Sequence, residues 1–240
     1  MTFSPLVVWH DVECGRYTAD LALWRELAAS AVGGGVLDVG AGTGRVALDL
    51  ALAGHDVTAL DREPVLLEAL AARALAAGLT VTTVAADAAA FSLDRSFGLI
   101  VVPMQTIQLL PSRAGFLASA RAHLPPGGLL AVAIVAALED FGADADELPA
   151  PDVGAVAGWR FASQPTAVRA SAAATRIERV RRSFSPDGRV TEEDDLIELA
   201  HLTVERLEAE GAAAGLSPEP PLTIAPTAEH VGSEVVLLRG

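Results

Sequence analysis

The sequence predicts an α/β fold in which helices cover a mostly parallel sheet. The segment 36–39, which predicts a short buried strand, passes through a glycine-rich turn into a helical pattern that starts near Arg45, the order of a strand, a tight turn and a helix. Further apolar segments then alternate with helical patterns, as in successive βα units. The segment 97–102 is apolar throughout, which is typical of a strand buried on both faces of a parallel sheet.

Composition favours one cytoplasmic domain with a substantial core. The chain has 240 residues, and 51% of them are hydrophobic, which excludes global disorder. No apolar run reaches the roughly 20 residues of a membrane span, and the first residues lack the pattern of a signal peptide. The single cysteine, Cys14, excludes an internal disulfide framework. We therefore expect a cytoplasmic protein with no membrane association.

Charge and histidine spacing exclude two kinds of partner. The formal net charge is −14, and all 17 Lys and Arg residues are Arg. Such an acidic surface repels phosphate backbones, so we expect no nucleic-acid partner. The five histidines are scattered without the spacing of a metal-ligand motif, so we expect no metal site.

The glycine turn has the chemistry of an anion-binding loop. Gly40, Gly42 and Gly44 form a GxGxG pattern, with Asp38 before it and Arg45 where a dinucleotide fingerprint has its third glycine. Glycine lets backbone amides approach a ligand closely. The unpaired amides at the start of the following helix favour a negative group such as a carboxylate.

Acidic residues follow the next two strands. Segment 55–60 ends in Asp61, about 20 residues beyond the glycine turn, where an acid accepts hydrogen bonds from ribose hydroxyls. Segment 80–85 runs into Asp87, for which capping of a turn or helix is the alternative role. Because the carboxyl ends of parallel strands share one edge of a sheet, these residues predict a nucleoside site.

These motifs resemble those of the class I S-adenosylmethionine (SAM)-dependent methyltransferases. The resemblance continues through the helix, Pro-Gly-Gly turn and strand of 113–135 and the helix and strand of 203–238. It implies a Rossmann-like three-layer sandwich whose seven-stranded, mostly parallel sheet has an antiparallel last strand. The implied parts are an N-terminal helical lid at 1–35, a SAM-binding core at 36–136, an inserted antiparallel hairpin cap at 137–200, and a C-terminal helix and strand at 201–240.

The resemblance implies SAM as the cofactor and gives roles to individual residues. Asp61 would bind the ribose, Asp87 the adenine amino group and the Ala88 amide the ring, while Tyr17 would lie near the methyl group or only pack the lid. Gln108 could contact a ligand or only shape the wall of the site. The predicted cofactor-binding residues are Tyr17, Asp38, Gly40, Ala41, Gly42, Gly44, Arg45, Asp61, Arg62, Asp87, Ala88, Pro103, Met104 and Gln105.

The second half of the chain predicts a β-hairpin. Ser185-Pro-Asp-Gly188 is a strong turn signal between two extended segments. Folding across this turn brings Arg179 and Arg181 near Asp194 and Glu192. We interpret these charges as a structural ladder and not as an anion site. In the resembling family such a unit caps the active site or forms a dimer contact, so a homodimer is one expectation.

Three further expectations concern local structure. An amphipathic helix is expected over 18–31 because its apolar residues recur at helical spacing. Segments 138–153 and 218–221, rich in Ala, Gly or Pro, are expected to be loops. His123, at the end of a predicted helix, is expected at the surface.

The predicted reaction is in-line transfer of a methyl group from SAM to a nitrogen or oxygen atom of a small-molecule acceptor. The protein mainly aligns the acceptor and excludes water, and a hydroxyl acceptor also needs a base. His10 is the preferred candidate base because imidazole titrates near neutrality, and Tyr17 is the second catalytic candidate. The other candidate bases are Asp11, Glu13, His201 and His230.

Two other function classes stay open. A methyltransferase fold without catalysis could serve as a binding or regulatory subunit, although Asp38, Gly40, Gly42, Asp61 and Asp87 argue against lost cofactor binding. An NAD(P)-dependent oxidoreductase is disfavoured, since it requires GxGxxG and a catalytic lysine in a chain that has no Lys.

Overall fold

The computed structural model describes residues 3–135, 138–142, 148–228 and 230–240. The chain divides into two compact units. The antiparallel unit comprises Met1–Tyr17 and Ala137–His201, and the core unit comprises Thr18–Ala136 and Leu202–Gly240. The predicted boundaries of lid, core, cap and C-terminal part stay a prediction. Along the described residues, no helix combines the length and the apolar character that crossing a membrane requires.

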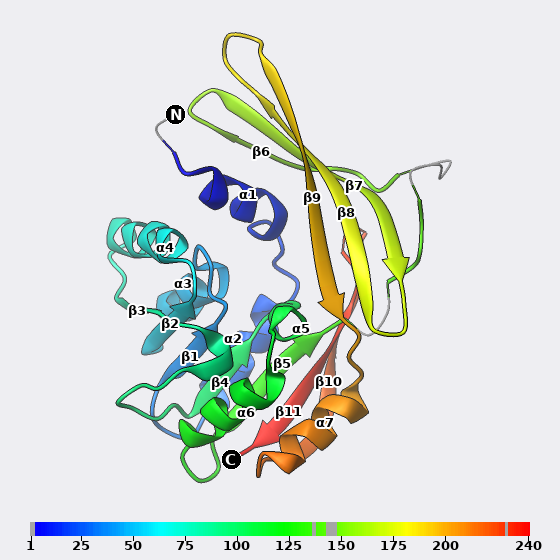
Figure 1. Ribbon diagram of the computed structural model, residues 1–240. Coiled ribbons are helices and arrows are strands. Elements are labelled where there is room, and N and C mark those ends of the chain that lie inside the picture. The colour runs from blue at the N-terminus through cyan, green and yellow to red at the C-terminus, as the bar shows by residue number, and fades with distance from the viewer. Residues whose placement is uncertain (1–2, 136–137, 143–147, 229) are drawn as a thin grey trace. The chain divides into compact units, whose positions relative to one another are not determined.

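The core unit is built on a seven-stranded sheet of order β10-β11-β5-β4-β1-β2-β3 (Figure 1). Its strands are β1 (Val36–Val39), β2 (Val57–Asp61), β3 (Val81–Ala85), β4 (Leu99–Val102), β5 (Leu129–Ile134), β10 (Ser217–Ile224) and β11 (Ser233–Arg239). Neighbours from β5 to β3 pair in parallel, whereas β11 runs antiparallel between β5 and β10. The predicted fold class and its antiparallel last strand are confirmed.

Helices cover both faces of this sheet (Figure 1). They are α2 (Leu21–Ser30), α3 (Arg45–Leu52), α4 (Pro64–Ala76), the 3₁₀ helix η1 (Ala88–Ala90), α5 (Thr106–Leu109), α6 (Arg113–Ala122) and α7 (Val204–Ala213). Phe116 of α6 and Leu207 of α7 share one hydrophobic cluster with Leu37 and Ile100 of the sheet, so these helices bury one face. The hydroxyl of Thr203 accepts from the Arg206 amide and caps α7.

The edge strand β10 corrects one prediction. Residues 218–221 were expected to be a loop, but Pro218, Pro220 and Pro221 lie in β10. Proline removes a ladder donor and is therefore confined to edge strands or irregularities. Both conditions hold, because β10 ends the sheet and its register shifts between Glu219 and Leu222.

The position of His123 corrects a second prediction, which placed this residue at the surface. It is buried at the end of α6, where its Nε2 accepts from the Leu93 amide at 2.8 Å and its Nδ1 donates to the Ser119 carbonyl at 2.7 Å. Its ring packs on Phe91. The imidazole thus satisfies backbone groups inside the unit and does not face solvent.

In its described residues, the antiparallel unit has a four-stranded sheet of order β6-β7-β8-β9 and one helix (Figure 1). Its elements are α1 (Pro5–Cys14), β6 (Asp152–Val156), β7 (Trp159–Ala170), β8 (Ala174–Phe184) and β9 (Val190–Ala200). Trp9 and Val12 of α1 pack on Phe161 of β7. The predicted β8–β9 hairpin is confirmed, but α1 was not predicted. Residues 152–153, expected to be in a loop, begin β6, and 143–147 of that expected loop lie outside the described residues.

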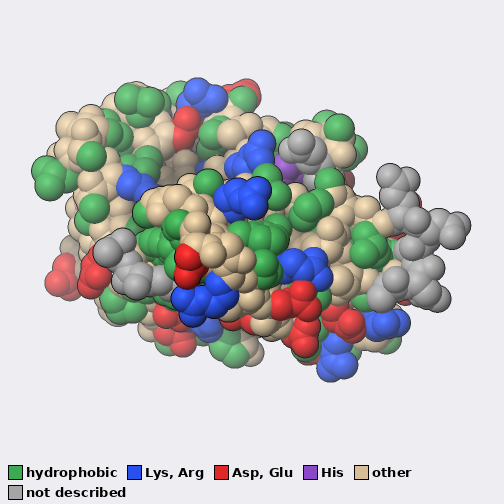
Figure 2. Space-filling view, turned by 90° about the horizontal axis from the view of Figure 1, so that it is seen from above, with side chains coloured by type: hydrophobic (Ala, Val, Ile, Leu, Met, Phe, Trp, Pro, Cys, Tyr) green, Lys and Arg blue, Asp and Glu red, His purple; other side chains and the backbone are tan. Residues whose placement is uncertain are grey.

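The hairpin register differs by one residue from the expected pairing. Arg179 lies opposite Asp195, and Arg181 opposite Glu193. Because successive side chains alternate between faces, a shift of one residue moves the expected partners to the opposite face. A cross-strand ladder does exist, formed by Arg182 with Glu192 at 2.6 Å and by Arg176 with Glu198 at 2.7 Å. On the face shown in Figure 2, acidic and Arg side chains likewise lie next to one another.

Candidate functional site

The turn from β1 into α3 needs its glycines. Gly40, Gly42 and Gly44 have φ of 72°, 55° and 96°, in the left-handed region that favours glycine. A Cβ on Gly40 would lie 2.5 Å from Cγ2 of Thr106, and one on Gly44 would lie 2.6 Å from Cγ of Leu70. The turn is therefore closely surrounded, and substitution by larger residues would displace it.

Asp61 joins the glycine turn to the neighbouring strand ends. The Gly42 amide donates to Asp61 Oδ2 at 2.8 Å, and the Glu63 amide donates to Oδ1 at 3.0 Å. The Asp61 carbonyl accepts from the Ala86 amide, just beyond β3, at 3.0 Å. The ends of β1, β2 and β3 therefore meet at one edge of the sheet, as the sequence predicts.

Asp87 follows β3 at this same edge. Its Oδ1 accepts from the Ala89 amide at 2.8 Å and caps η1, which begins with the buried residue Ala88. The alternative role as a cap is thus realised. Recognition of an adenine amino group by Asp87, and of the ring by the Ala88 amide, stays a prediction.

Asp38, at the end of β1, is a buried carboxyl group with little compensation. Only 1% of the residue is exposed, and neither oxygen forms a hydrogen bond of standard geometry with a described residue. Burial raises the pKa of Asp38 to about 7, although the Arg45 charge and the Ala47 amide oppose the rise. The charges of Asp61 and Asp20 raise it further.

Arg45, the first residue of α3, is held by an acid that the sequence did not single out. Its Nη1 and Nη2 donate to Asp20 Oδ1 and Oδ2 at 2.5 and 2.8 Å. Asp20 Oδ2 also accepts from Trp24 Nε1 at 2.8 Å. Before a helix, Asp is expected to act as an N-cap, yet Asp20 makes no side-chain cap bond. Its partner lies 25 residues away, so local sequence gives no signal of this pair.

The end of β4 carries the predicted residues Pro103, Met104 and Gln105. Met104 has a φ of 55°, a conformation that is uncommon for a residue with a side chain and that recurs at functional sites. The Thr106 hydroxyl donates to the Pro103 carbonyl at 3.1 Å, and the same side chain packs against Gly40. This strand end therefore contacts the glycine turn.

Gln108 has a structural role that sequence left open. Its Nε2 donates to the Val135 carbonyl at 3.1 Å, and its Oε1 accepts from the Val135 amide at 2.9 Å. Its amide therefore pairs with both backbone groups of the residue that follows β5.

The remaining predicted residues belong to several parts of the chain. Arg62 follows Asp61 but is exposed, with an ion pair to Glu63 at 3.2 Å. His10 and Tyr17 belong to the antiparallel unit, as do the candidate bases Asp11, Glu13 and His201, whereas His230 belongs to the core unit. The catalytic roles of His10 and Tyr17 stay predictions.

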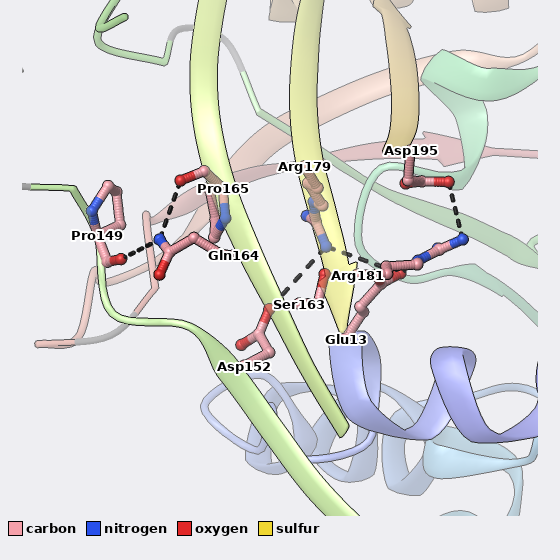
Figure 3. A network of polar contacts seen from close by, with 9 residues as sticks. All are labelled: Glu13, Pro149, Asp152, Ser163, Gln164, Pro165, Arg179, Arg181 and Asp195. Atoms are coloured by element: carbon pink, nitrogen blue, oxygen red, sulfur yellow. Dashed lines mark hydrogen bonds and ion pairs between the residues drawn. The ribbon is translucent and has the colours of Figure 1, made fainter. Parts of the chain in front are cut away.

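Glu13 instead forms the centre of a polar network within the antiparallel unit (Figure 3). Arg181 donates to both of its oxygens at 2.7 Å, and the Ser163 hydroxyl donates at 2.8 Å. Burial raises the pKa of Glu13, but Arg181, Arg179 and Ser163 outweigh it and hold the pKa below its usual value. A carboxylate so stabilised is a poor base. No group of three or more His, Cys, Asp and Glu residues suited to a metal occurs within the described part of the chain.

The sheet order and the glycine turn with its neighbouring acids define the fold of a class I methyltransferase. Residues 36–128 match the family model described as a methyltransferase domain. No curated protein matches the sequence. The predicted resemblance to SAM-dependent methyltransferases is confirmed, and so is SAM as the cofactor of that class.

Solved structures resemble nearly the whole chain. DesVI of Streptomyces venezuelae is 25% identical, with a TM-score of 0.69 over 90% of this chain and 87% of its own. KedS8, a sugar N-methyltransferase from a Streptoalloteichus species, is 21% identical, with a TM-score of 0.74 over 100% and 95%. SAM-bound CalS10, an amino pentose methyltransferase from Micromonospora echinaspora, is 20% identical, with a TM-score of 0.69 over 100% and 98%.

Proposed function

We propose that this protein transfers the methyl group of SAM to a nitrogen or oxygen atom of a small-molecule acceptor. The observation that carries the proposal is the pair of hydrogen bonds by which Asp61 joins the glycine turn to the end of β3. These residues lie within the segment that matches a methyltransferase domain. KedS8 and CalS10 are described as enzymes that act on sugars. Their similarity favours the amino group of a sugar as the acceptor.

The residues of this edge fit the groups of SAM. The amides of the glycine turn and the start of α3 suit its carboxylate. The Asp61 oxygens, each bonded to one backbone amide, retain lone pairs for ribose hydroxyls. The buried Asp38 carboxyl lacks a hydrogen-bond donor that an ammonium group would supply.

Bound SAM would supply a methyl group made electrophilic by its sulfonium. The residues of the chain have to align the acceptor atom with the carbon–sulfur bond and keep water away. An amine acceptor attacks through its lone pair, so it must be unprotonated, and a base is needed only to carry a proton away from the nitrogen. His10 and Tyr17 are the candidates that we propose for it.

Binding and turnover test the proposal separately. Calorimetry should show that S-adenosylhomocysteine binds and that NADH does not. Asp61→Ala should weaken this binding about 10- to 100-fold, because it removes the acceptor for ribose and for the Gly42 amide. Gly42→Val should abolish it, because valine strongly disfavours the φ of 55°. Unchanged affinity in both variants would refute the assignment of the site.

The acceptor class is tested with SAM and matched pairs of amino and hydroxy sugars. Release of S-adenosylhomocysteine with the amino member alone supports nitrogen as the acceptor. Release with the hydroxy member would contradict it. Binding without turnover of any acceptor would favour the silent-subunit alternative.

A further inference from the structure

The ion pair between Asp20 and Arg45 lies at the start of the helix that follows the glycine turn. The two side chains are 1% and 10% exposed, so the pair is buried. Arg45 meets Asp20 through two parallel hydrogen bonds, the geometry in which a guanidinium is held most firmly. Trp24 donates a third bond to the same carboxylate. The guanidinium is therefore directed to Asp20.

Asp38 is influenced by the same charges. Three charged groups change the pKa of Asp38. They are Arg45 at the start of α3, Asp61 at the end of β2, and Asp20, which directly precedes α2. Arg45 is the one positive charge among these three and has the largest charge effect on Asp38, while its Nη1 and Nη2 donate to Asp20. Asp38 itself receives no hydrogen bond of standard geometry from a described residue, so burial dominates and keeps its pKa raised.

We propose that Asp20 is a positioning residue for the cofactor: by holding the Arg45 guanidinium, it keeps the Asp38 carboxyl free to receive the ammonium group of SAM. The proposal rests on the proposed function and adds to it a residue outside the glycine motif. Without Asp20, the guanidinium of Arg45 would be released next to a buried carboxyl group. It would then compete with the ammonium for Asp38.

This arrangement couples cofactor binding to pH. The pKa of Asp38 lies at about 7 in the ligand-free protein, and a bound ammonium group lowers it. Binding should therefore release a proton near neutral pH. Affinity should rise about tenfold from pH 6 to pH 8, because the free protein no longer has to lose that proton.

The test compares the wild type with Asp20→Asn by calorimetry at pH 6 and pH 8, using S-adenosylhomocysteine as the probe. The variant should bind about tenfold more weakly at pH 8, and its affinity should be nearly independent of pH, because Arg45 already stabilises ionised Asp38. Asp20→Glu, which keeps the charge, should restore part of the pH dependence. A purely structural role would not move this profile.

Two controls keep the outcomes distinct. 5′-Methylthioadenosine lacks the amino-acid group, so Asp20→Asn should leave its affinity unchanged and show that the site is folded. The second control is an ion pair elsewhere in the core unit, in which Arg113 of α6 donates two hydrogen bonds of 2.7 Å to Glu210 of α7. Glu210→Gln removes the charge of this acid and should not alter binding of either ligand.

Each result decides one proposal. If S-adenosylhomocysteine binds the wild type and Asp20→Asn changes neither its affinity nor the pH profile, the positioning role is wrong. Equal losses for both ligands would also overturn it. If neither ligand binds the wild type, the proposed function itself fails.

Discussion

Two buried carboxyl groups, one in each unit, have opposite environments. Glu13 of the antiparallel unit receives hydrogen bonds from Arg181 and Ser163, and its pKa lies below the usual value. Asp38 of the core unit receives none of standard geometry, and its pKa is raised to about 7. Burial opposes ionisation in both, so the partners decide the difference.

The comparison separates a structural acid from one suited to a ligand. The bonds of Glu13 are completed within its own unit, where it fastens α1 to β7 and β8. Asp38 lies beside the glycine turn and keeps its acceptor atoms unused. A buried polar group without a partner is costly, and such groups are retained where a ligand completes them.

The largest effect should come from depriving Glu13 of its main partner. Arg181→Met should lower the free energy of unfolding by about 3 kcal/mol, because it leaves a buried carboxylate with only the Ser163 hydrogen bond and the longer ion pair to Arg179. Urea denaturation at pH 7 measures this. A loss below about 1 kcal/mol would show that Glu13 is not the stabilised acid described here.

The next effect should have the opposite sign. Asp38→Asn should stabilise the ligand-free protein at pH 8 by about 2 kcal/mol and by a smaller amount at pH 5, where only part of the ionisation cost applies. The pKa rises from 3.8 to about 7 on folding, so ionisation of Asp38 costs stability as pH increases through this range and the full cost applies above 7. The shift sets an upper limit of about 4 kcal/mol, which relaxation of the site should reduce.

Denaturation of both proteins at the two pH values checks this. Equal stability of variant and wild type at pH 8 would mean that Asp38 has a partner in solution. The comparison with Glu13 would then lose its basis.

The smallest effect should come from the neighbour of Arg181 on the other face of the same strand. Arg182 pairs with Glu192 at 2.6 Å, but these side chains are 39% and 56% exposed. Arg182→Met should therefore change the free energy of unfolding by less than about 0.5 kcal/mol. This variant is the matched control for Arg181→Met, and a similar loss in both would show that the effect is not specific to Glu13.

The meeting of the glycine turn with the neighbouring strand ends could be predicted because its signals are local. Gly40, Gly42 and Gly44 have left-handed conformations, and Asp61 is the last residue of a strand whose other residues are buried. Once the strands are parallel, their carboxyl ends must share one edge. The bond from Gly42 to Asp61 follows from that topology.

The antiparallel unit was harder to predict because its determinants are distant in sequence. Glu13 and Arg181 are 168 residues apart, and α1 was not predicted. The hairpin was correctly placed by its turn, yet its register could be derived only to within one residue. A register shift of one residue decides whether Arg181 lies on the sheet face of Arg182 and Glu192 or on the face of Glu13. The pair of Asp20 and Arg45 was missed for the same reason of distance.

Gln108 has a consequence for how the chain can vary. By pairing with both backbone groups of Val135, its side chain adds one more pair of hydrogen bonds beyond the end of β5. The core sheet is thereby closed off two residues before the inserted segment begins at 137. The length and sequence of that insertion can then diverge between relatives without leaving an open hydrogen-bond position in the core.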